Sequence, residues 1–259
     1  MDWVVKPPGT LLQLLYLESR LSKVPVGRFI EVGPGAGDIT ETLLRYGWRG
    51  VVYEFDSESA ARLETRFKSD IAAGRLEIRP ESFEVDNIDE PVQMVISCMV
   101  MEHLSDIDEA AYMSWVRGAL VAGGVLIGLV PGSPCDWGIE DATAGHFRRY
   151  DRWRLERLFR EHGFCSGHIA GLTFPLSNLL LKFSNFLVNR AEGGNLSAPI
   201  VERTRRSGRR HVPFKTTFPR WAILFLNRYT LLPFHWLQIQ FSGAERCLVL
   251  YFEATSPRQ

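Results

Sequence analysis

The chain of 259 residues has few cysteines, no excess of either charge and no long apolar run. Its four cysteines are scattered and form no C-x-x-C pair, so we expect neither a disulfide framework nor a structural zinc site. No stretch of about 18 uninterrupted apolar residues occurs, which argues against a membrane-spanning helix. The start, Met1-Asp2-Trp3, lacks the basic and then apolar pattern of a secretory signal. These absences favour a globular protein of the reducing cytoplasm.

The neutral total hides two halves of opposite charge. Residues 1–150 carry 14 Lys and Arg against 23 Asp and Glu, a formal charge of −9. Residues 151–259 carry 16 against 7, a formal charge of +9. Nine cationic or near-cationic side chains, and no acid, fall between Arg203 and Arg228. We expect the acidic half to hold a cation and the basic half to meet an anionic partner.

Strand and helix signals alternate through the first two thirds of the chain. Apolar runs predict strands at residues 28–32, 50–55, 76–78, 94–98, 125–130 and 165–172, with a last strand at 246–253. A capping pattern at Ser105 predicts a helix that ends at Gly123-Gly124, just before a strand. Alternation with short joints predicts an α/β fold with a mainly parallel sheet and helices on both faces.

About 70 residues separate the last two predicted strands, and a connection of that length is usually functional or mobile. It contains an amphipathic stretch from Leu176, a Gly/Ser/Arg-rich segment and an aromatic run, in which Pro219 and Pro233 are expected to bracket a helix. Three interpretations stay open. The segment could be a lid packed on the body, a surface for a membrane or lipid-linked acceptor, or, least favoured, an RNA-binding surface.

The most informative segment is Glu31-Val32-Gly33-Pro34-Gly35-Ala36-Gly37-Asp38, which follows the first predicted strand. Its glycines allow a tight turn and a close approach to a ligand. A dinucleotide fingerprint would place its third glycine where Asp38 stands, at the start of a helix that we expect the Asp38 carboxylate to cap. The acids Glu31 and Asp38 therefore disfavour NAD and suit a cationic nucleoside such as S-adenosylmethionine. No P-loop lysine follows.

At these residues the sequence resembles the class I S-adenosylmethionine-dependent methyltransferases. Their first motif, acid-x-Gly-x-Gly-x-Gly, is matched by Glu31, Gly33, Gly35 and Gly37. The resemblance extends to an Ala-Gly-Gly turn before the fifth strand and covers about residues 28–172 plus the last strand. It implies a seven-stranded, mainly parallel Rossmann-like sheet, with residues 1–172 and 243–259 as cofactor-binding core and 173–242 as a helical, basic and aromatic insert.

The resemblance also implies roles for side chains beyond the glycine turn. Glu54, after the second strand, is expected to hold the ribose hydroxyls, with Asp56 as a weaker candidate. Phe83 occupies the place of the residue that caps the adenine, and Ser97 lies on the strand that leads to the family's Glu-His ending, here Glu102-His103. One departure is Gln93, where many relatives carry an acid.

Two histidines follow strands whose carboxyl ends form the expected ligand edge of the sheet. His103 follows the fourth strand, and His146 lies in Gly-His-Phe-Arg-Arg-Tyr after the fifth, a segment that resembles one found in bacterial enzymes of cell-envelope biosynthesis. Either histidine could act as general base near neutral pH. Arg148, Arg149 and Tyr150 are expected to contact substrate, although packing of this loop is an equal alternative.

The sequence thus predicts methyl transfer from S-adenosylmethionine, most favourably to oxygen of a sugar, a glycolipid precursor or another small metabolite. The alternatives are N- or C-methylation of a small molecule or RNA, and a non-catalytic subunit that binds the cofactor. We expect no metal, because no convergent carboxylate cluster is evident. The expected partner is a small-molecule or lipid-linked acceptor, with peripheral membrane contact through the insert, whereas a nucleic-acid partner is disfavoured.

Overall fold

The computed structural model describes residues 5–83, 90–193, 198–207 and 211–258. The chain divides into two compact units, which are described separately. The sheet unit comprises Val24–Val130, Arg152–Ile169 and Tyr251–Gln259. The helical unit comprises Met1–Lys23, Pro131–Asp151 and Ala170–Leu250, and therefore contains the whole of the predicted insert together with two further segments.

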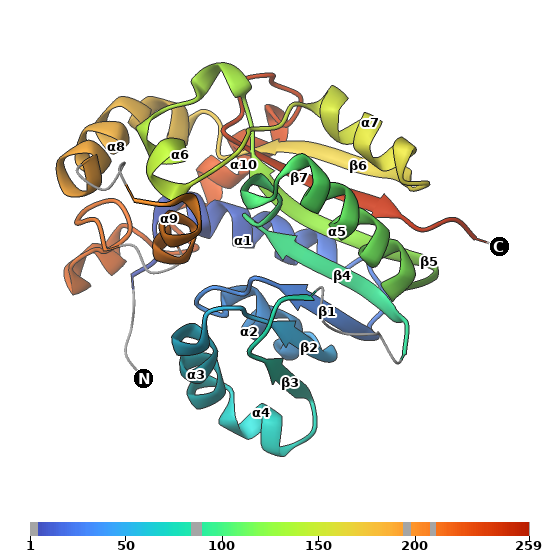
Figure 1. Ribbon diagram of the computed structural model, residues 1–259. Coiled ribbons are helices and arrows are strands. Elements are labelled where there is room, and N and C mark those ends of the chain that lie inside the picture. The colour runs from blue at the N-terminus through green and yellow to red at the C-terminus, as the bar shows by residue number, and fades with distance from the viewer. Residues whose placement is uncertain (1–4, 84–89, 194–197, 208–210, 259) are drawn as a thin grey trace. The chain divides into compact units, whose positions relative to one another are not determined.

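A seven-stranded sheet runs in the order β3-β2-β1-β4-β5-β7-β6 (Figure 1). The strands from β1 to β5 pair in parallel, whereas β7 runs opposite to β5, since Gly124 accepts from Ser256 and Gly132 donates to Leu248. This confirms the predicted Rossmann-like methyltransferase topology. The strands are β1 (Arg28–Val32), β2 (Arg49–Tyr53), β3 (Leu76–Arg79), β4 (Val92–Cys98), β5 (Leu120–Pro131), β6 (Cys165–Leu172) and β7 (Val249–Thr255).

Two helices of the sheet unit, α3 and α5, begin at side-chain caps. Asp56 accepts a hydrogen bond from the Ser59 backbone N–H at the start of α3, and the Ser105 hydroxyl accepts from the Asp108 N–H at the start of α5. Each cap satisfies a backbone donor that the helix itself leaves open. The helices are α2 (Asp38–Arg45), α3 (Ser57–Arg66), α4 (Lys68–Ala72), α5 (Asp106–Ala119) and α7 (Arg152–Glu161).

The predicted end of α5 at Gly123-Gly124 is wrong. The helix ends at Ala119, and β5 begins directly at Leu120. Gly123 lies inside the strand with φ of +74°, next to a register shift between β4 and β5. The two glycines therefore serve an irregularity of the strand, where a positive φ favours glycine, rather than a helix end.

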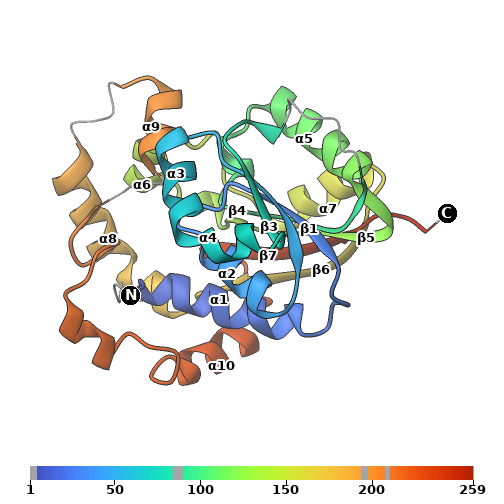
Figure 2. The same cartoon turned by 90° about the horizontal axis from the view of Figure 1, so that it is seen from below.

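The helical unit contains the helices of the predicted insert, which precede β7 as expected, and an N-terminal helix. The predicted helix between Pro219 and Pro233 does not form as one element: a short 3-10 helix, η5 (Arg220–Leu224), is followed by turns, and Pro233 lies in the first turn of α10. Helices α1 and α10 lie side by side (Figure 2). The remaining helices are α1 (Pro8–Leu21), η3 (Pro134–Asp136), α6 (Ile139–Ala144), α8 (Leu176–Glu192), α9 (Ile200–Ser207) and α10 (Leu232–Gln240).

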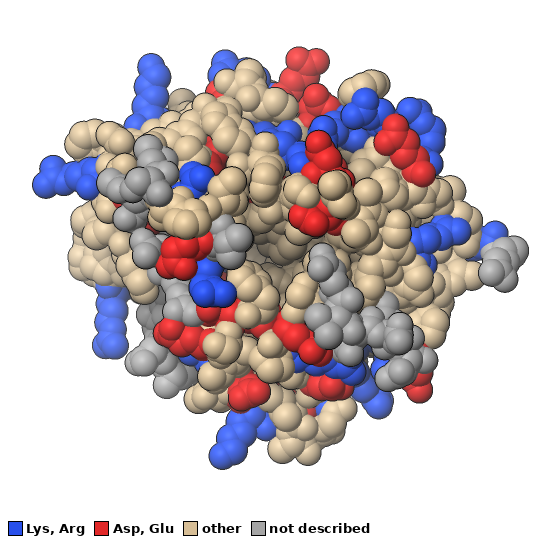
Figure 3. Space-filling view, viewed as in Figure 1, with Lys and Arg blue, Asp and Glu red and all other residues tan. Residues whose placement is uncertain are grey.

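The surface charge is mixed on the face that Figure 3 shows. Lys and Arg side chains occur in several separate places there, with Asp and Glu side chains among them (Figure 3). Within the described ranges, every helix is too short or too polar to cross a lipid bilayer. Arg209 and Arg210 of the basic run lie outside the described residues.

Candidate active site

The glycine turn after β1 leaves one position open to a ligand. Gly33, Gly35 and Gly37 have φ of +68°, +56° and +82°, a backbone region that residues other than glycine rarely adopt. A Cβ on Gly33 would lie 2.6 Å from Val100 Cγ2, and one on Gly37 would lie 2.7 Å from the Phe67 ring. A Cβ on Gly35 would meet nothing within 4 Å. Gly33 and Gly37 are therefore required by packing, whereas Gly35 borders free space that a cofactor could occupy.

Glu31, on β1, lies buried beside this turn. Its carboxylate accepts a hydrogen bond of 2.6 Å from the Thr40 hydroxyl, and the residue is 2% exposed. Burial raises the pKa of Glu31 to about 7, with the negative charges of Asp38 and Glu54 adding to the shift. A cationic group bound nearby would favour the ionised carboxylate and lower this pKa again. The buried acid is thus suited to respond to a cation.

Asp38 is the first residue of α2, and the N-cap is Gly37 rather than the predicted Asp38. The Asp38 carboxylate lies 3.3 Å from the Arg66 guanidinium, which also contacts Glu41 at 2.7 Å and donates to the Ala36 carbonyl. Arg66 therefore offsets part of the negative charge of Asp38, the charge that is expected to repel a bound diphosphate. The sequence pattern gave no sign of this arginine, because it comes from α3.

Glu54 follows β2, directly beside the glycine turn. The Gly33 N–H donates to the Tyr53 carbonyl at 3.0 Å, which joins the ends of the two strands. Glu54 is 5% exposed, and its Oε1 accepts from the Asp56 N–H at 3.0 Å. Asp56 itself caps α3. The open position at Gly35 and this adjacent carboxylate fit an adenosine-containing cofactor, whereas the ribose contact of Glu54 stays a prediction.

Phe83 and Ser97 lie in an aromatic cluster of the sheet unit. The Phe83 ring packs edge-on against Tyr112, with centroids 5.2 Å apart, and tilted against Trp115 at 5.1 Å. Ser97 is 1% exposed and accepts a hydrogen bond of 2.8 Å from the Tyr112 hydroxyl. Tyr112 and Trp115 were not among the predicted residues, although their spacing on one face of α5 was visible in the sequence. The cofactor contacts of Phe83 and Ser97 stay predictions.

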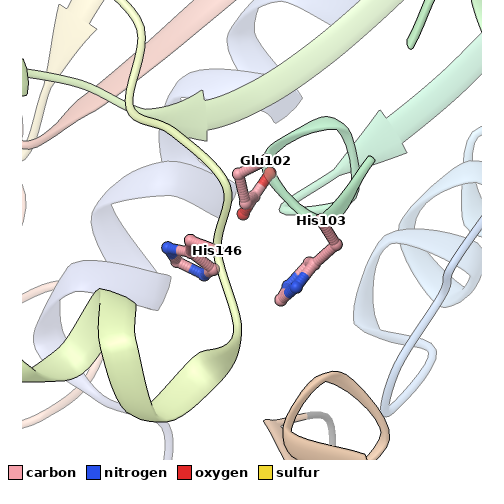
Figure 4. A group of neighbouring side chains, drawn as sticks. All are labelled: Glu102, His103 and His146. Carbon is pink, nitrogen blue, oxygen red and sulfur yellow. The ribbon is translucent and has the colours of Figure 1, made fainter. Parts of the chain in front are cut away.

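The chain turns sharply after β4 into a short 3-10 helix, η2 (Met101–His103), on which Figure 4 shows Glu102 and His103. Met99 has φ of +58°, and its N–H donates to the Leu129 carbonyl at 2.8 Å. Glu102 is fully buried, whereas His103 is half-buried. The sheet unit therefore offers one partly accessible imidazole at the carboxyl end of β4.

His146 belongs to the helical unit and lies just after α6 (Figure 4). Gly145 ends that helix with φ of +77°, and the His146 Nδ1 then lies 2.9 Å from Asp141 Oδ1. The same oxygen accepts from Arg149 Nε at 2.8 Å, while Oδ2 accepts from the Gly138 N–H at 2.9 Å. The side chains of His146 and Asp141 are 12% and 1% exposed. Three donors thus converge on one buried carboxylate.

These contacts fix the charge of Asp141 and the tautomer of His146. Burial alone would raise the pKa of Asp141, but the hydrogen bonds from His146 and Arg149, the Arg149 charge and the Gly138 N–H lower it to about 2. The carboxylate is therefore ionised at neutral pH. An ionised acceptor at Nδ1 favours the tautomer that carries its proton there, so that Nε2 keeps its lone pair. In that tautomer a neutral His146 could accept a proton at Nε2.

The neighbours of His146 serve the interior of the helical unit. Arg149, whose side chain is 7% exposed, also donates to the Gly132 carbonyl at 3.1 Å. Tyr150 is fully buried, and its N–H donates to the Pro131 carbonyl at 2.8 Å. Arg148 is half-buried. Substrate contacts by these three residues stay predictions. Asp141 was not predicted, because an acid five residues before a histidine across a helix end has no periodic signature.

Residues 11–165 match a family model described as a methyltransferase domain, which is more than half of the chain. The chain belongs to this family. The resemblance to class I S-adenosylmethionine-dependent methyltransferases is thereby confirmed, and the protein is a methyltransferase. No curated protein sequence matches this methyltransferase.

Many solved structures share the fold. The N-methyltransferase NodS from Bradyrhizobium japonicum WM9, in complex with S-adenosyl-L-homocysteine, is 20% identical, with a TM-score of 0.50 over 63% of this chain and 77% of that one. Phosphoethanolamine N-methyltransferase 2 of Haemonchus contortus, in complex with S-adenosyl-L-methionine, is 15% identical, with a TM-score of 0.60 over 95% of this chain and 52% of that longer one. The mycolic acid cyclopropane synthase CmaA1 is 16% identical, with a TM-score of 0.58 over 94% and 84%.

Proposed function

We propose that this methyltransferase methylates a hydroxyl oxygen of a sugar, a glycolipid precursor or another small metabolite, with His146 as the general base. The observation that carries the proposal is the buried Asp141 carboxylate bound to His146 Nδ1. A hydroxyl group is a poor nucleophile until its proton is removed, whereas an amine attacks through a lone pair that it already has. An imidazole held as a proton acceptor is therefore of most use with an oxygen nucleophile.

The cofactor in this proposal is S-adenosylmethionine, bound in the sheet unit. Gly33, Gly35 and Gly37 would form the turn against it, Glu31 and Asp38 would face its cationic end, and Glu54 would hold the ribose. Phe83 and Ser97 would line the adenine side. When bound, this cofactor supplies a methyl group already activated by its attachment to a sulfonium. The protein then has to position the acceptor and to remove its proton.

The residues of the helical unit would handle the proton. His146 Nε2 accepts the proton of the acceptor hydroxyl while Nδ1–H remains donated to Asp141. The imidazolium that forms is stabilised by the ionised Asp141 carboxylate, and Arg149 holds that carboxylate in place. Asp141 and Arg149 are positioning residues in this scheme. His103 is the second candidate for the base, and the half-buried Arg148 is one of the three predicted substrate contacts.

The test is a methyl-transfer assay with labelled S-adenosylmethionine and a panel of sugars, glycolipid precursors and amines of matched size. His146→Gln should lower kcat by roughly 10²–10⁴-fold, the range for a lost general base, and should flatten the acid limb of the pH profile. Asp141→Asn should lower kcat and leave KM for the cofactor unchanged. Asp136→Asn is the matched control, because Asp136 is also paired, with Arg246 at 2.8 Å, and also has a lowered pKa.

Two results would overturn the proposal. The first is efficient methylation of amines with none of hydroxyl acceptors, which would move the enzyme to the alternative of N-methylation. The second is a kcat of His146→Gln within about twofold of wild type together with a loss in His103→Gln, which would assign the base to the sheet unit. The absence of any labelled product with every acceptor would favour the non-catalytic subunit.

We extend the proposal to a cytoplasmic enzyme that serves cell-envelope biosynthesis. All four cysteines lie in the described ranges, and none forms a disulfide, which supports a reducing compartment. The Gly-His-Phe-Arg-Arg-Tyr segment supports a role in cell-envelope biosynthesis, because it resembles a segment found in bacterial enzymes of that pathway. Fractionation of cells that express the tagged protein tests the location, and recovery from an oxidising compartment would contradict it.

A further inference from the structure

Helix α10 has its polar side inward and its apolar side outward. Gln238 is its one buried residue, with no exposed surface. Leu232, Trp236 and Ile239 are 49%, 60% and 42% exposed. Their spacing of four and three residues places them on one face of the helix. A helix of a globular protein ordinarily turns such a face toward the core.

Buried hydrogen bonds hold α10 in this orientation. Gln238 Nε2 donates to the Leu12 carbonyl of α1 at 2.9 Å, and Gln238 Oε1 accepts from the Thr173 N–H at 2.9 Å. His235 Nδ1 lies 2.8 Å from the same Nε2. Rotating the helix to bury its apolar face would break these bonds and leave buried polar groups unsatisfied, which is unfavourable. The outward direction of the apolar face is therefore built into the helical unit.

The segment before α10 exposes further large side chains. Trp221, Leu224, Phe225 and Tyr229 are 62%, 69%, 67% and 75% exposed. Scattered exposed hydrophobic residues are normal, but a group of this size on one short segment marks an interaction surface. We call the following set the aromatic face: Trp221, Leu224, Phe225, Tyr229, Leu232, Trp236 and Ile239.

The chain segment that carries the aromatic face is basic, and one of its cations, Arg228, pairs with Glu18 of α1 at 3.1 Å. Residues 203–244 contain eight Lys and Arg and no Asp or Glu. Arg220, next to Trp221, is exposed. Basic residues are attracted to an anionic lipid surface, and Trp and Tyr are the side chains enriched at membrane interfaces. A second copy of this chain would bring the same positive segment against itself, so charge disfavours a homodimer through this face.

We propose that the aromatic face binds peripherally to a lipid bilayer with an anionic surface. Helix α10 has nine residues and is about 14 Å long, too short to span the apolar layer, so it would lie in the plane of the interface. The apolar side chains enter the headgroup region, and the exposed Arg220 faces lipid phosphates. This inference concerns where the enzyme docks and does not depend on which atom of the acceptor is methylated.

Vesicle sedimentation of the full chain tests the inference. We expect binding to vesicles of phosphatidylcholine and phosphatidylglycerol in equal parts, weaker binding at high salt, and little binding to phosphatidylcholine alone. The double variant Trp221→Ser, Trp236→Ser should lose at least roughly tenfold in bound fraction. Trp153→Ser is the matched control, because Trp153 is 62% exposed, as Trp221 is, but lies in the sheet unit, and its variant should bind as wild type does.

Because all the substituted side chains are exposed, the variants should keep the wild-type circular dichroism spectrum and melting temperature. Equal loss of binding in the Trp153 control, or no binding to anionic vesicles by the folded wild-type chain, would overturn the inference. Binding to single-stranded RNA in place of vesicles would assign the face to nucleic acid instead. A concentration-dependent dimer that only the double variant abolishes, without vesicle binding, would assign it to a second copy. Because methylation of a soluble acceptor is a separate readout, failure here leaves the proposed reaction standing.

Discussion

The two units bury a carboxylate in opposite ways. Glu31 of the sheet unit receives a hydrogen bond from the Thr40 hydroxyl, and burial raises its pKa to about 7. Asp141 of the helical unit receives three donors, two of them from ring or guanidinium nitrogens, and its pKa falls to about 2 despite burial. The charge of Asp141 is therefore already balanced by donors of its own unit. Glu31 gains most from a cation supplied by a ligand.

The units differ also in what they expose. Among the large hydrophobic residues that are exposed in the described part of the chain, 16 of 21 belong to the helical unit. In the sheet unit the strands turn their apolar side chains inward, as Phe29 and Met94 do with no exposed surface. The sheet unit thus encloses its apolar side chains, whereas the helical unit leaves large apolar side chains exposed, as the proposed contact with a lipid surface requires.

The largest expected effect concerns the open glycine of the sheet unit. Gly35→Val should weaken the binding of S-adenosylmethionine by at least about a thousandfold, or 4 kcal/mol, because the new side chain would fill the space left for the cofactor. Gly74→Val is the matched control: Gly74 has φ of +65°, and a Cβ there also meets nothing within 4 Å. Calorimetric titration should show wild-type affinity for the control. Equal weakening in both variants would attribute the effect to backbone strain.

The pH dependence of stability should show the contrast between the two acids. The pKa of Glu31 is about 7 in the folded state and has its ordinary value of 4.5 in the unfolded state, so stability falls as the pH rises between these values. At 1.36 kcal/mol per pKa unit, the loss is about 3 kcal/mol. Glu31→Gln should abolish this loss in thermal unfolding followed from pH 4.5 to about pH 8. An unchanged pH dependence in the variant would mean that Glu31 is ionised in the cofactor-free protein.

Asp141 should behave in the opposite sense. Its folded pKa of about 2 lies below its ordinary value of 3.8, so its contribution to stability is present above pH 3.8 and is lost as the pH falls toward 2. Asp141→Asn should lower the free energy of unfolding at neutral pH by about 2 kcal/mol, with a smaller deficit at low pH. Urea unfolding at several pH values measures this. A deficit that does not change with pH would mean that the loss of charge at Asp141 is not its cause.

The smallest effect is expected at Arg66 of the sheet unit. This guanidinium pairs with Asp38 and Glu41, but its side chain is 33% exposed, and such pairs contribute at most about 1 kcal/mol. Arg66→Ala should therefore change the free energy of unfolding by less than about 1 kcal/mol. The comparison variant is Arg62→Ala, since Arg62 pairs with Glu58 on the same helix. A much larger effect at Arg66 would show that its bond to the Ala36 carbonyl holds the glycine turn.

The sheet could be predicted from the sequence because its signals are local. Short apolar runs separated by helix-length segments fix the alternation, and the glycine turn marks the first crossover. The end of α5 was misplaced, because Gly123-Gly124 is typical of a helix end, whereas its positive φ here serves an irregular strand. Helix α1 was not predicted, although its buried residues Leu12, Tyr16 and Leu17 repeat at helical spacing.

The candidate site could be predicted from the sequence only in part. The glycine turn and Glu54 are separated by a fixed distance along a βα unit, so their meeting follows from the topology. Arg66 reaches Asp38 from α3 through tertiary packing, and Asp141 meets His146 across a helix end. Neither arrangement leaves a periodic pattern in the sequence. The apolar composition of α10 was visible, but the direction of its apolar face depends on Gln238 and its partners in α1 and near α8.

The most direct test of the central claim is calorimetric titration of the wild-type chain with S-adenosylmethionine and, separately, with NAD. The turn after β1 has an open glycine, two buried carboxylates beside it, and an arginine that offsets part of the charge of Asp38. We predict saturable binding of S-adenosylmethionine and no measurable binding of NAD. Binding of NAD with no heat from S-adenosylmethionine would contradict the account.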